Sequence, residues 1–358
     1  MMNRIGKINY RQINRISPSQ FYSMKNCAYK SILAEAFEKK PLLPISPTAY
    51  LGIVMHKMLE LISKGTVSSE EEFDFQFNEQ VKFQEETLKQ LGYPFFVPLQ
   101  KNVKDFGMKK ILLKKHLKNR VIRTGSARSI KIDSEKWFES ADKSIGGKID
   151  LIIEEGFETE IIDFKTGGIT HDVLDDEGDV FSNIKNEYKE QLKLYAYLYF
   201  EKTGKYPVRL SLVDLAKQKF TVDFTSHECK TIFDEARELL KATNNSINNS
   251  IFSANPSVEN CKYCLYRPAC SYFLEYLKIN DSFNDISGRI SKVVKYLNGN
   301  VTVFIDLPER SISVMGFIAE NLQYFNENIN NTIAIFNVKK EASENVYSVT
   351  RTTTIYDQ

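Results

Sequence analysis

The stretch of sequence that decides the fold is the pair of runs Lys148-Ile-Asp-Leu-Ile-Ile153 and Thr159-Glu-Ile-Ile-Asp-Phe-Lys165. Both runs are rich in β-branched residues, and the turn Glu154-Glu-Gly156 lies between them, so they predict a β-hairpin. Residues 130–138 alternate roughly between apolar and polar just before this hairpin. Together the three runs predict a meander of three strands.

Three charged side chains converge on this predicted hairpin. Residues two apart in a strand project to the same side, so Asp163 and Lys165 project together while Ile162 and Phe164 face the core. Asp150 lies on the neighbouring strand. Carboxylates bind hard cations such as Mg²⁺ or Mn²⁺, and a lysine can orient a metal-activated water or neutralise developing charge. The set suits metal-dependent phosphodiester hydrolysis, although an Asp-x-Lys triplet taken alone is usually a surface ion pair.

Helical periodicity surrounds the meander. Ser17 and Pro18 form a start signal for a helix that we expect to run through Cys27 towards Phe37. The basic run 109–128 is either a solvated helix face or a track for phosphates. We expect helices over residues 17–37, 47–62, 70–91, 101–123, 187–200 and 229–244, and further strands over 208–215 and 220–224. This order predicts an α/β or α+β core.

The sequence changes character after Asn280. Short β-rich segments alternate with turn signals such as Asn298-Gly299 and Asn330-Asn331. We interpret this part as a small β-barrel with an OB-like fold. Such barrels often bind single-stranded nucleic acid, and a protein-docking module is the alternative. We therefore predict two domains, residues 1–279 and residues 280–358.

Composition bounds the class of protein. The chain has 358 residues, of which 42% are hydrophobic and 26% charged, with a formal net charge of +2. These values are ordinary for a soluble globular protein that buries its core without disulfides. No stretch approaches the roughly 20 apolar residues that cross a bilayer, and residues 1–10 hold no apolar run of signal-peptide length. We expect a cytoplasmic protein with no membrane contact.

Cysteine spacing indicates a metal site. Three of the five cysteines, Cys261, Cys264 and Cys270, are clustered, and in a reducing compartment such spacing favours metal binding over disulfides. Cysteine thiolates suit either an iron–sulfur cluster or structural zinc, and the spacing alone leaves both open. Cys229 is expected to be a buried thiol on a helix.

The motifs on the meander resemble those of the PD-(D/E)XK nuclease superfamily, in its RecB-like exonuclease branch. Gly147-Lys-Ile-Asp150 is similar to the "G-x-x-D" motif and Asp163-Phe-Lys165 to the (D/E)-x-K motif. The resemblance implies a restriction-endonuclease-like core in which Asp150 and Asp163 are catalytic metal ligands and Lys165 is the catalytic lysine. The middle acid is aspartate where many relatives have glutamate, and both occur.

Two further segments extend the resemblance on either side. Gly52-Ile-Val-Met-His-Lys-Met-Leu-Glu60 is similar to the family's helix motif, which implies that His56 is a metal ligand. Gln191-Leu-Lys-Leu-Tyr195 is similar to the "Q-x-x-x-Y" motif, which implies that Gln191 and Tyr195 touch the DNA strand. The resemblance covers residues 17–278 and leaves the last part of the chain unexplained.

The cysteines also match a pattern within this branch. In AddB-type and CRISPR-adaptation exonucleases, one cysteine near the N-terminus and three near the C-terminus hold a [4Fe–4S] cluster. The similar positions here are Cys27, Cys261, Cys264 and Cys270, so the resemblance implies a cluster that staples the ends of the nuclease domain. Zinc on the same four thiolates is the alternative.

The expected function is that of a Mg²⁺- or Mn²⁺-dependent nuclease, an exonuclease on single-stranded DNA or duplex ends. No G-x-x-x-x-G-K-[ST] phosphate loop is present. The chain therefore acts alone or with a separate helicase or a defence-complex subunit, in DNA repair, recombination or antiviral defence. The alternative is a non-catalytic subunit that holds DNA or a partner in a larger helicase–nuclease or defence complex.

Overall fold

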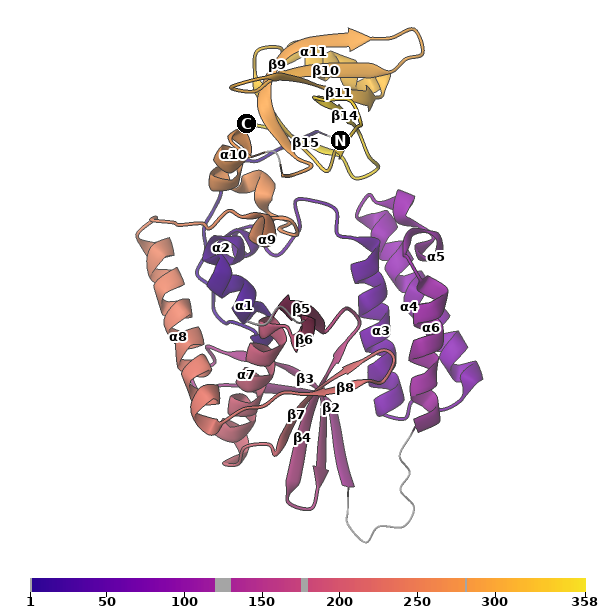
Figure 1. Cartoon of the computed structure of the whole chain (residues 1–358), viewed down its shortest axis with the longest axis vertical. Helices are drawn as coiled ribbons and strands as arrows, with labels where there is room; N and C mark the ends of the chain where they lie inside the picture. The colour runs from indigo at the N-terminus through magenta and orange to yellow at the C-terminus, as the bar shows by residue number, and fades with distance from the viewer. Residues whose placement is uncertain (1, 120–129, 175–179, 281) are drawn as a thin grey trace. The chain divides into compact units, whose positions relative to one another are not determined.

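The computed structural model describes residues 2–119, 130–174, 180–280 and 282–358 (Figure 1). The chain forms two compact units. The central unit comprises residues 13–25 and 46–245, and the terminal unit comprises residues 1–12, 26–45 and 246–358. The terminal unit thus joins segments from both ends of the sequence.

A five-stranded sheet forms the centre of the central unit. Its order is β2-β3-β4-β7-β8, and all neighbours are antiparallel except β4 and β7, which run parallel. The first three strands are the predicted meander, which is confirmed. The strands are β2 (Ile130–Glu139), β3 (Gly146–Glu155), β4 (Glu158–Lys165), β7 (Arg209–Asp214) and β8 (Lys219–Thr221).

Helices cover this sheet on two sides (Figure 1). On one side lie α7 (Asn186–Thr203) and α8 (Ser226–Asn248), joined by the rings of Tyr197 and Phe233, whose centroids are 4.2 Å apart. On the other side lie α3 (Pro47–Ser63), α4 (Glu70–Gln90) and α6 (Phe106–Lys114). The predicted helices near 47, 70, 187 and 229 are confirmed, and the unit is a mixed α/β fold compatible with a PD-(D/E)XK core.

Local signals explain where these helices begin. The hydroxyl of Ser46 accepts from the backbone N–H of Thr48, and Pro47 occupies the first helical position. At α4, Ser69 and Glu72 form a reciprocal capping box. Each cap satisfies backbone donors that the first helical turn leaves without a partner. The start of α3 matters because this helix carries His56.

Two predicted helices are wrong in detail. The helix expected over 17–37 is broken into α1 (Pro18–Asn26) and α2 (Ala28–Ala36), because Cys27 between them has an extended backbone with φ −156° and ψ 92°. The helix expected over 101–123 is broken into α5 (Leu99–Asn102), α6 and the short 3₁₀ helix η2 (Lys115–Asn119). Asp105, the residue directly before α6, has a left-handed backbone, which aspartate tolerates better than most residues. Residues 120–123 of that prediction lie outside the described part of the chain.

The hairpin β5 (Thr170–Leu174) and β6 (Val180–Ile184) was not predicted. The short 3₁₀ helix η1 (Pro94–Phe96) was also missed.

The terminal unit carries the clustered cysteines and the C-terminal strands. After α9 (Val258–Cys261), η3 (Arg267–Ala269) and α10 (Ser271–Lys278) comes an eight-stranded curled sheet in the order β1-β15-β12-β9-β10-β11-β14-β13. Its strands are β1 (Met2–Arg4), β9 (Ile286–Lys295), β10 (Val301–Asp306), β11 (Ser311–Phe317), β12 (Thr332–Phe336), β13 (Lys339–Lys340), β14 (Val346–Ser348) and β15 (Thr354–Asp357), with η4 (Ala319–Asn321) and α11 (Leu322–Glu327) between β11 and β12.

The pairing pattern of these strands is specific. β9 is antiparallel to both β10 and β12, β11 is parallel to β14, and β12 is antiparallel to β15. A continuous apolar core lies inside the curled sheet, with Ile290, Val303 and Phe325 fully buried.

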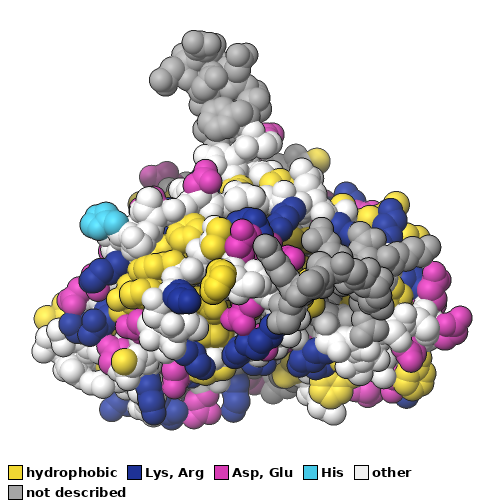
Figure 2. Space-filling model, turned by 90° about the horizontal axis from the view of Figure 1, so that it is seen from below, with side chains coloured by type: hydrophobic (Ala, Val, Ile, Leu, Met, Phe, Trp, Pro, Cys, Tyr) yellow, Lys and Arg dark blue, Asp and Glu magenta, His cyan; other side chains and the backbone are white. Residues whose placement is uncertain are grey.

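Surface charge is mixed. On the face seen in Figure 2, Lys and Arg side chains are interspersed with Asp and Glu, in keeping with the net charge of +2. Among the helices of the described residues, none combines the length and the apolar character needed to span a membrane.

Candidate active site

The meander places the predicted acids side by side. In the pairing of β3 with β4, Leu151 lies opposite Ile162. Continuing this register by one residue places Asp150 opposite Asp163. The backbone N–H of Phe164 donates to Oδ2 of Asp150 at 2.8 Å, which fixes that carboxyl against β4. The two carboxyl groups are thus held by a rigid hairpin and not by a loop.

Lys165, Asp163 and Gln191 form a closed triangle. The ammonium of Lys165 lies 2.7 Å from Oδ2 of Asp163 and donates to Oε1 of Gln191 at 2.8 Å. The amide of Gln191 donates to Oδ1 of Asp163 at 2.9 Å. All three side chains are largely buried. Ion pairs of this kind, with hydrogen bonds from a neutral amide, hold the lysine in one orientation.

Tyr188 is a member of this site that sequence analysis missed. Its ring lies beneath the ammonium of Lys165, with the nitrogen 4.3 Å from the ring centroid, a cation–π contact. Tyr188, Gln191 and Tyr195 are spaced i, i+3 and i+7 on α7, so they share one helix face. That spacing was the available signal, because it extends the Gln191–Tyr195 pair by one turn.

Tyr195 packs against β3 at Gly147, a position that has no side chain. A Cβ added at Gly147 would lie 3.3 Å from the Tyr195 ring and hydroxyl and 3.0 Å from Pro18. The glycine of the G-x-x-D stretch therefore lets α7 approach β3. Burial and the negative charges of Asp163 and Asp150 raise the pKa of Tyr195, so its hydroxyl stays protonated. The structure brings it beside the acids.

His56 approaches the site from α3. Its Nδ1 lies 3.9 Å from Oδ2 of Asp150. Burial lowers the pKa of His56, which keeps the imidazole neutral near pH 7 and able to act as a metal ligand. His56 also lines an open groove together with residues of α3 and of the loop after Lys165: Ser46, Thr48, Ala49, Gly52, Ile53, Thr166 and Gly167. The groove is open to solvent beside His56.

The electrostatics of the acids are those of a cation site. Burial and the charge of Asp163 raise the pKa of Asp150 well above its ordinary value, against the lowering effect of the Phe164 N–H. Two carboxylates this close cannot both ionise without a neighbouring positive charge. Oδ2 of Asp163 is buried and receives no hydrogen bond of acceptable geometry from the described residues, although the Lys165 ammonium is close.

These groups fit a hard divalent cation by their chemistry. Two carboxyl groups and a neutral imidazole are oxygen and nitrogen donors of the kind that bind Mg²⁺ or Mn²⁺. Within the described residues, no three His, Cys, Asp or Glu side chains already converge closely enough to enclose an ion. Mg²⁺ is commonly held by one or two carboxylates together with water and substrate phosphate, so a complete protein cage is not required.

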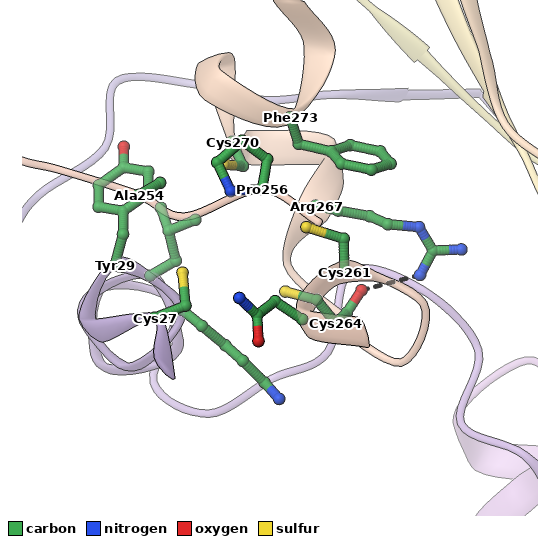
Figure 3. Close-up of a pocket in the computed structure, with 12 residues that line it drawn as sticks. Cys27, Tyr29, Ala254, Pro256, Cys261, Cys264, Arg267, Cys270 and Phe273 are labelled. Atoms are coloured by element: carbon green, nitrogen blue, oxygen red, sulfur yellow. Dashed lines mark hydrogen bonds between the residues drawn. The ribbon is translucent and has the colours of Figure 1, made fainter. Parts of the chain in front are cut away.

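The four predicted cysteine ligands meet in the terminal unit. Cys27, Cys261, Cys264 and Cys270 line one small pocket, and their sulfur atoms surround it in Figure 3. Cys27 is the residue between α1 and α2, and Cys270 directly precedes α10, so each comes from a helix boundary. Burial raises the pKa of the Cys261 thiol to about 11 and that of Cys270 to about 12. Cys229 is apart from them, fully buried on α8.

A buried ion pair supports the cysteine loop. Arg267 lies between Cys264 and Cys270, donates to the Cys264 carbonyl at 2.8 Å and pairs with Asp285 at 2.5 Å. It also donates to Asn337 at 2.9 Å. Since Asp285 and Asn337 flank strands β9 and β12, this network ties the cysteine pocket to the curled sheet. Removing one partner of such a buried pair is strongly destabilising.

Some lysines of the basic run 109–128 form ion pairs with acidic residues of α4. Lys110 pairs with Asp74 on α4 at 2.9 Å, and Lys114 pairs with Asp74 and Glu70. Exposed pairs of this kind contribute little to stability. They do reduce the positive charge that this face could offer to phosphates. Residues 120–128 of the run lie outside the described residues.

Comparisons with known proteins agree with this geometry. The solved structure named "Putative exonuclease" from Eubacterium rectale is similar at a TM-score of 0.42 and 8% identity, covering 70% of this chain and 87% of that one. A likeness at that level carries no argument by itself. No curated protein matches the sequence. The family model described as PD-(D/E)XK nuclease superfamily matches residues 15–271, which include His56, the meander and α7. The chain belongs to the PD-(D/E)XK nuclease superfamily.

Proposed function

We propose that this protein is a Mg²⁺- or Mn²⁺-dependent deoxyribonuclease that cleaves single-stranded DNA or duplex ends as an exonuclease. The observation that carries the proposal is the triangle of Asp163, Lys165 and Gln191 beside Asp150. An ordinary surface ion pair has no need of a buried amide bound to both of its members. A superfamily match over the same residues supports the assignment.

Each residue has a distinct role in this proposal. Asp150, Asp163 and His56 would hold the divalent cation, which when bound supplies an activated water and stabilises charge at phosphorus. Lys165 would orient the attacking water and neutralise developing negative charge. Gln191 accepts a hydrogen bond from the Lys165 ammonium and donates one to the Asp163 carboxyl group. These two bonds fix the positions of both side chains relative to each other. Tyr195, with its protonated hydroxyl, would help to position the DNA strand.

The groove beside His56 supports a strand-shaped substrate. It is open, and its lining includes Gly167 and three residues with hydroxyl side chains, Ser46, Thr48 and Thr166, groups able to hydrogen-bond phosphate oxygens. Single strands or frayed duplex ends would fit such a groove, in DNA repair, recombination or defence.

The four-cysteine pocket is proposed to hold a [4Fe–4S] cluster. Four thiols around one cavity, three of them on buried residues, are the ligand set that such clusters use. Zinc on the same thiolates is the competing assignment. Anaerobic purification followed by iron and sulfide analysis and a visible spectrum separates the two, because a zinc site is colourless.

The C-terminal residues 280–358 are proposed to form an OB-like barrel. β14 and β15 follow one another in the chain, and they pair with β11 and β12, the strands at either end of the run β12-β9-β10-β11. The segment 346–357 therefore supports closure of the sheet into a ring. Such a module would hold a DNA strand or a separate helicase or defence-complex subunit.

The first experiment is cleavage of end-labelled single- and double-stranded DNA by anaerobically purified protein with Mg²⁺, Mn²⁺ or EDTA. The variant for comparison is Lys165→Ala, which removes the ammonium, with circular dichroism to establish that the variant is folded. Metal-dependent cleavage that the variant lacks is the expected result, and the products give polarity. Cleavage that is equal in the variant, or no cleavage with any metal, would replace this proposal by the non-catalytic subunit of a larger helicase–nuclease or defence complex.

A further inference from the structure

A third carboxylate stands in line with the two acids of the site. β2 and β3 keep one register on both sides of Glu135, with Ser134 opposite Leu151 and Lys136 opposite Ile149. Glu135 therefore lies opposite Asp150, which itself lies opposite Asp163 on β4. One row across three neighbouring strands carries three acids, while Glu135 belongs to no motif discussed above.

The backbone at Glu135 is in an unusual state. It has φ +53° within a ten-residue strand, and the pairing skips this position although the register continues. A non-glycine residue in the left-handed region is uncommon and its backbone is strained. Like charges directly opposite each other in a sheet are also destabilising. Two unfavourable features thus coincide at one residue.

The direction of the Glu135 side chain follows from its contact with Lys148 on the neighbouring strand β3. Oε2 of Glu135 lies 3.5 Å from the ammonium of Lys148, which is two residues before Asp150 on the same strand. Residues two apart share a side of the strand, so Glu135 reaches the side that carries the Asp150 carboxyl.

The Lys148 pair does not by itself account for this arrangement. The lysine side chain is 61% exposed while that of Glu135 is only 21% exposed. An exposed ion pair contributes little to stability, so it does not offset a strained backbone and an opposed carboxyl group. A cation bound between the carboxylates would offset the cost of the strained backbone and of the opposed carboxyl groups, because each negative charge would be attracted to the cation.

We propose that Glu135 is a further ligand of the divalent metal centre, acting with Asp150 either directly or through a metal-bound water. This inference rests on the proposed function, because it assumes that the centre binds Mg²⁺ or Mn²⁺. It assigns β2 a chemical role beyond that of a strand in the sheet. All three strands of the meander then contribute a carboxylate to one centre.

The test is calorimetric titration of Mn²⁺ into the whole chain, without DNA, for the wild type, Glu135→Gln and Glu139→Gln. Loss of a ligand or of its supporting hydrogen bond typically weakens metal binding 10- to 100-fold. We expect at least a tenfold weaker Mn²⁺ affinity in Glu135→Gln. Glu139→Gln is the matched control, because Glu139 is on the same strand but pairs with Arg15, and its affinity should equal that of the wild type.

A second variant separates ligation from folding. Glu135→Gly removes the carboxylate and suits the left-handed backbone, so its thermal midpoint should equal or exceed that of the wild type while its Mn²⁺ affinity falls as in Glu135→Gln. Unchanged Mn²⁺ affinity in both variants would overturn the inference, and so would a lowered thermal midpoint in both, which indicates a structural role. If the wild type neither binds Mn²⁺ nor cleaves DNA, the proposed function fails instead.

Discussion

The carboxylate site of the central unit and the cysteine pocket of the terminal unit are built in opposite ways. The acids lie on neighbouring strands of one meander, close in sequence, and the adjacent His56 lines an open groove. The thiols come from both ends of the chain and line a small pocket. In both places burial raises the pKa of groups that are proposed as ligands, of Asp150 in one and of Cys261 and Cys270 in the other. The difference fits the proposal that one site admits a substrate and the other holds distant segments together.

The largest expected effect is on DNA cleavage. It tests whether the carboxylate site can be disabled while the cysteine pocket stays intact. Asp163→Ala should reduce DNA cleavage at least 100-fold, because it removes a proposed metal ligand and the partner of Lys165. The visible spectrum and iron content should not change, since the cysteine pocket belongs to the other unit. Gel assays of end-labelled DNA beside absorbance spectra measure both. A variant that loses its colour together with its activity would contradict the separation.

The second prediction concerns the removal of one thiol from the cysteine pocket. Cys264→Ser should abolish the iron–sulfur absorbance and lower the thermal midpoint by about 5 °C or more, because the pocket loses a ligand that links residues from both ends of the chain. Cys229→Ala is the control: this thiol is buried on α8 outside the pocket, so iron content should be retained. Scanning fluorimetry and iron analysis check the pair. Equal iron in both variants would rule out Cys264 as a ligand.

A smaller effect concerns the titration of Asp150. Its pKa in the folded protein is raised above the ordinary value of 3.8, so ionisation costs stability as pH rises from about 4 towards the raised pKa. In EDTA, Asp150→Asn should therefore be more stable than the wild type at pH 8, by about 1 kcal/mol or 2–4 °C, and the difference should shrink at pH 5. Added Mn²⁺ should reverse the order at pH 8. Thermal melts at both pH values are the measurement, and a difference that grows at low pH would contradict the sign.

The smallest expected effect sharpens the role of Tyr188. Tyr188→Leu should lower kcat about tenfold, because Lys165 loses the ring beneath its ammonium. Tyr188→Phe keeps the ring and should lie within about twofold of the wild type. Metal binding should be the same in both. Equal loss of activity in both variants would assign the role to the hydroxyl and not to the ring.

Sequence reasoning was strongest where chemistry and local pattern coincide. The meander, α3 and α7 followed from periodicity, and the strand alternation brought Asp163 and Lys165 together as expected. Residues whose backbone departs from the local pattern were missed. Cys27 interrupts a stretch with good helical periodicity, and Glu135 adopts a left-handed backbone inside a strand. Both departures serve tertiary placement of a side chain, which no local propensity encodes.

The link between the first and the last strand has a consequence for biosynthesis. β1 pairs in parallel with β15, Met2 with Ile355 and Arg4 with Asp357. Residues 2–4 therefore leave the ribosome long before residues 355–357, and this sheet edge can form only when both segments have been synthesised. Cys27 likewise emerges long before Cys261, whereas residues 46–245 of the central unit are continuous in the chain. Residues 46–245 can therefore begin to fold during translation, whereas the thiol pocket can be assembled only after Cys270 has been synthesised.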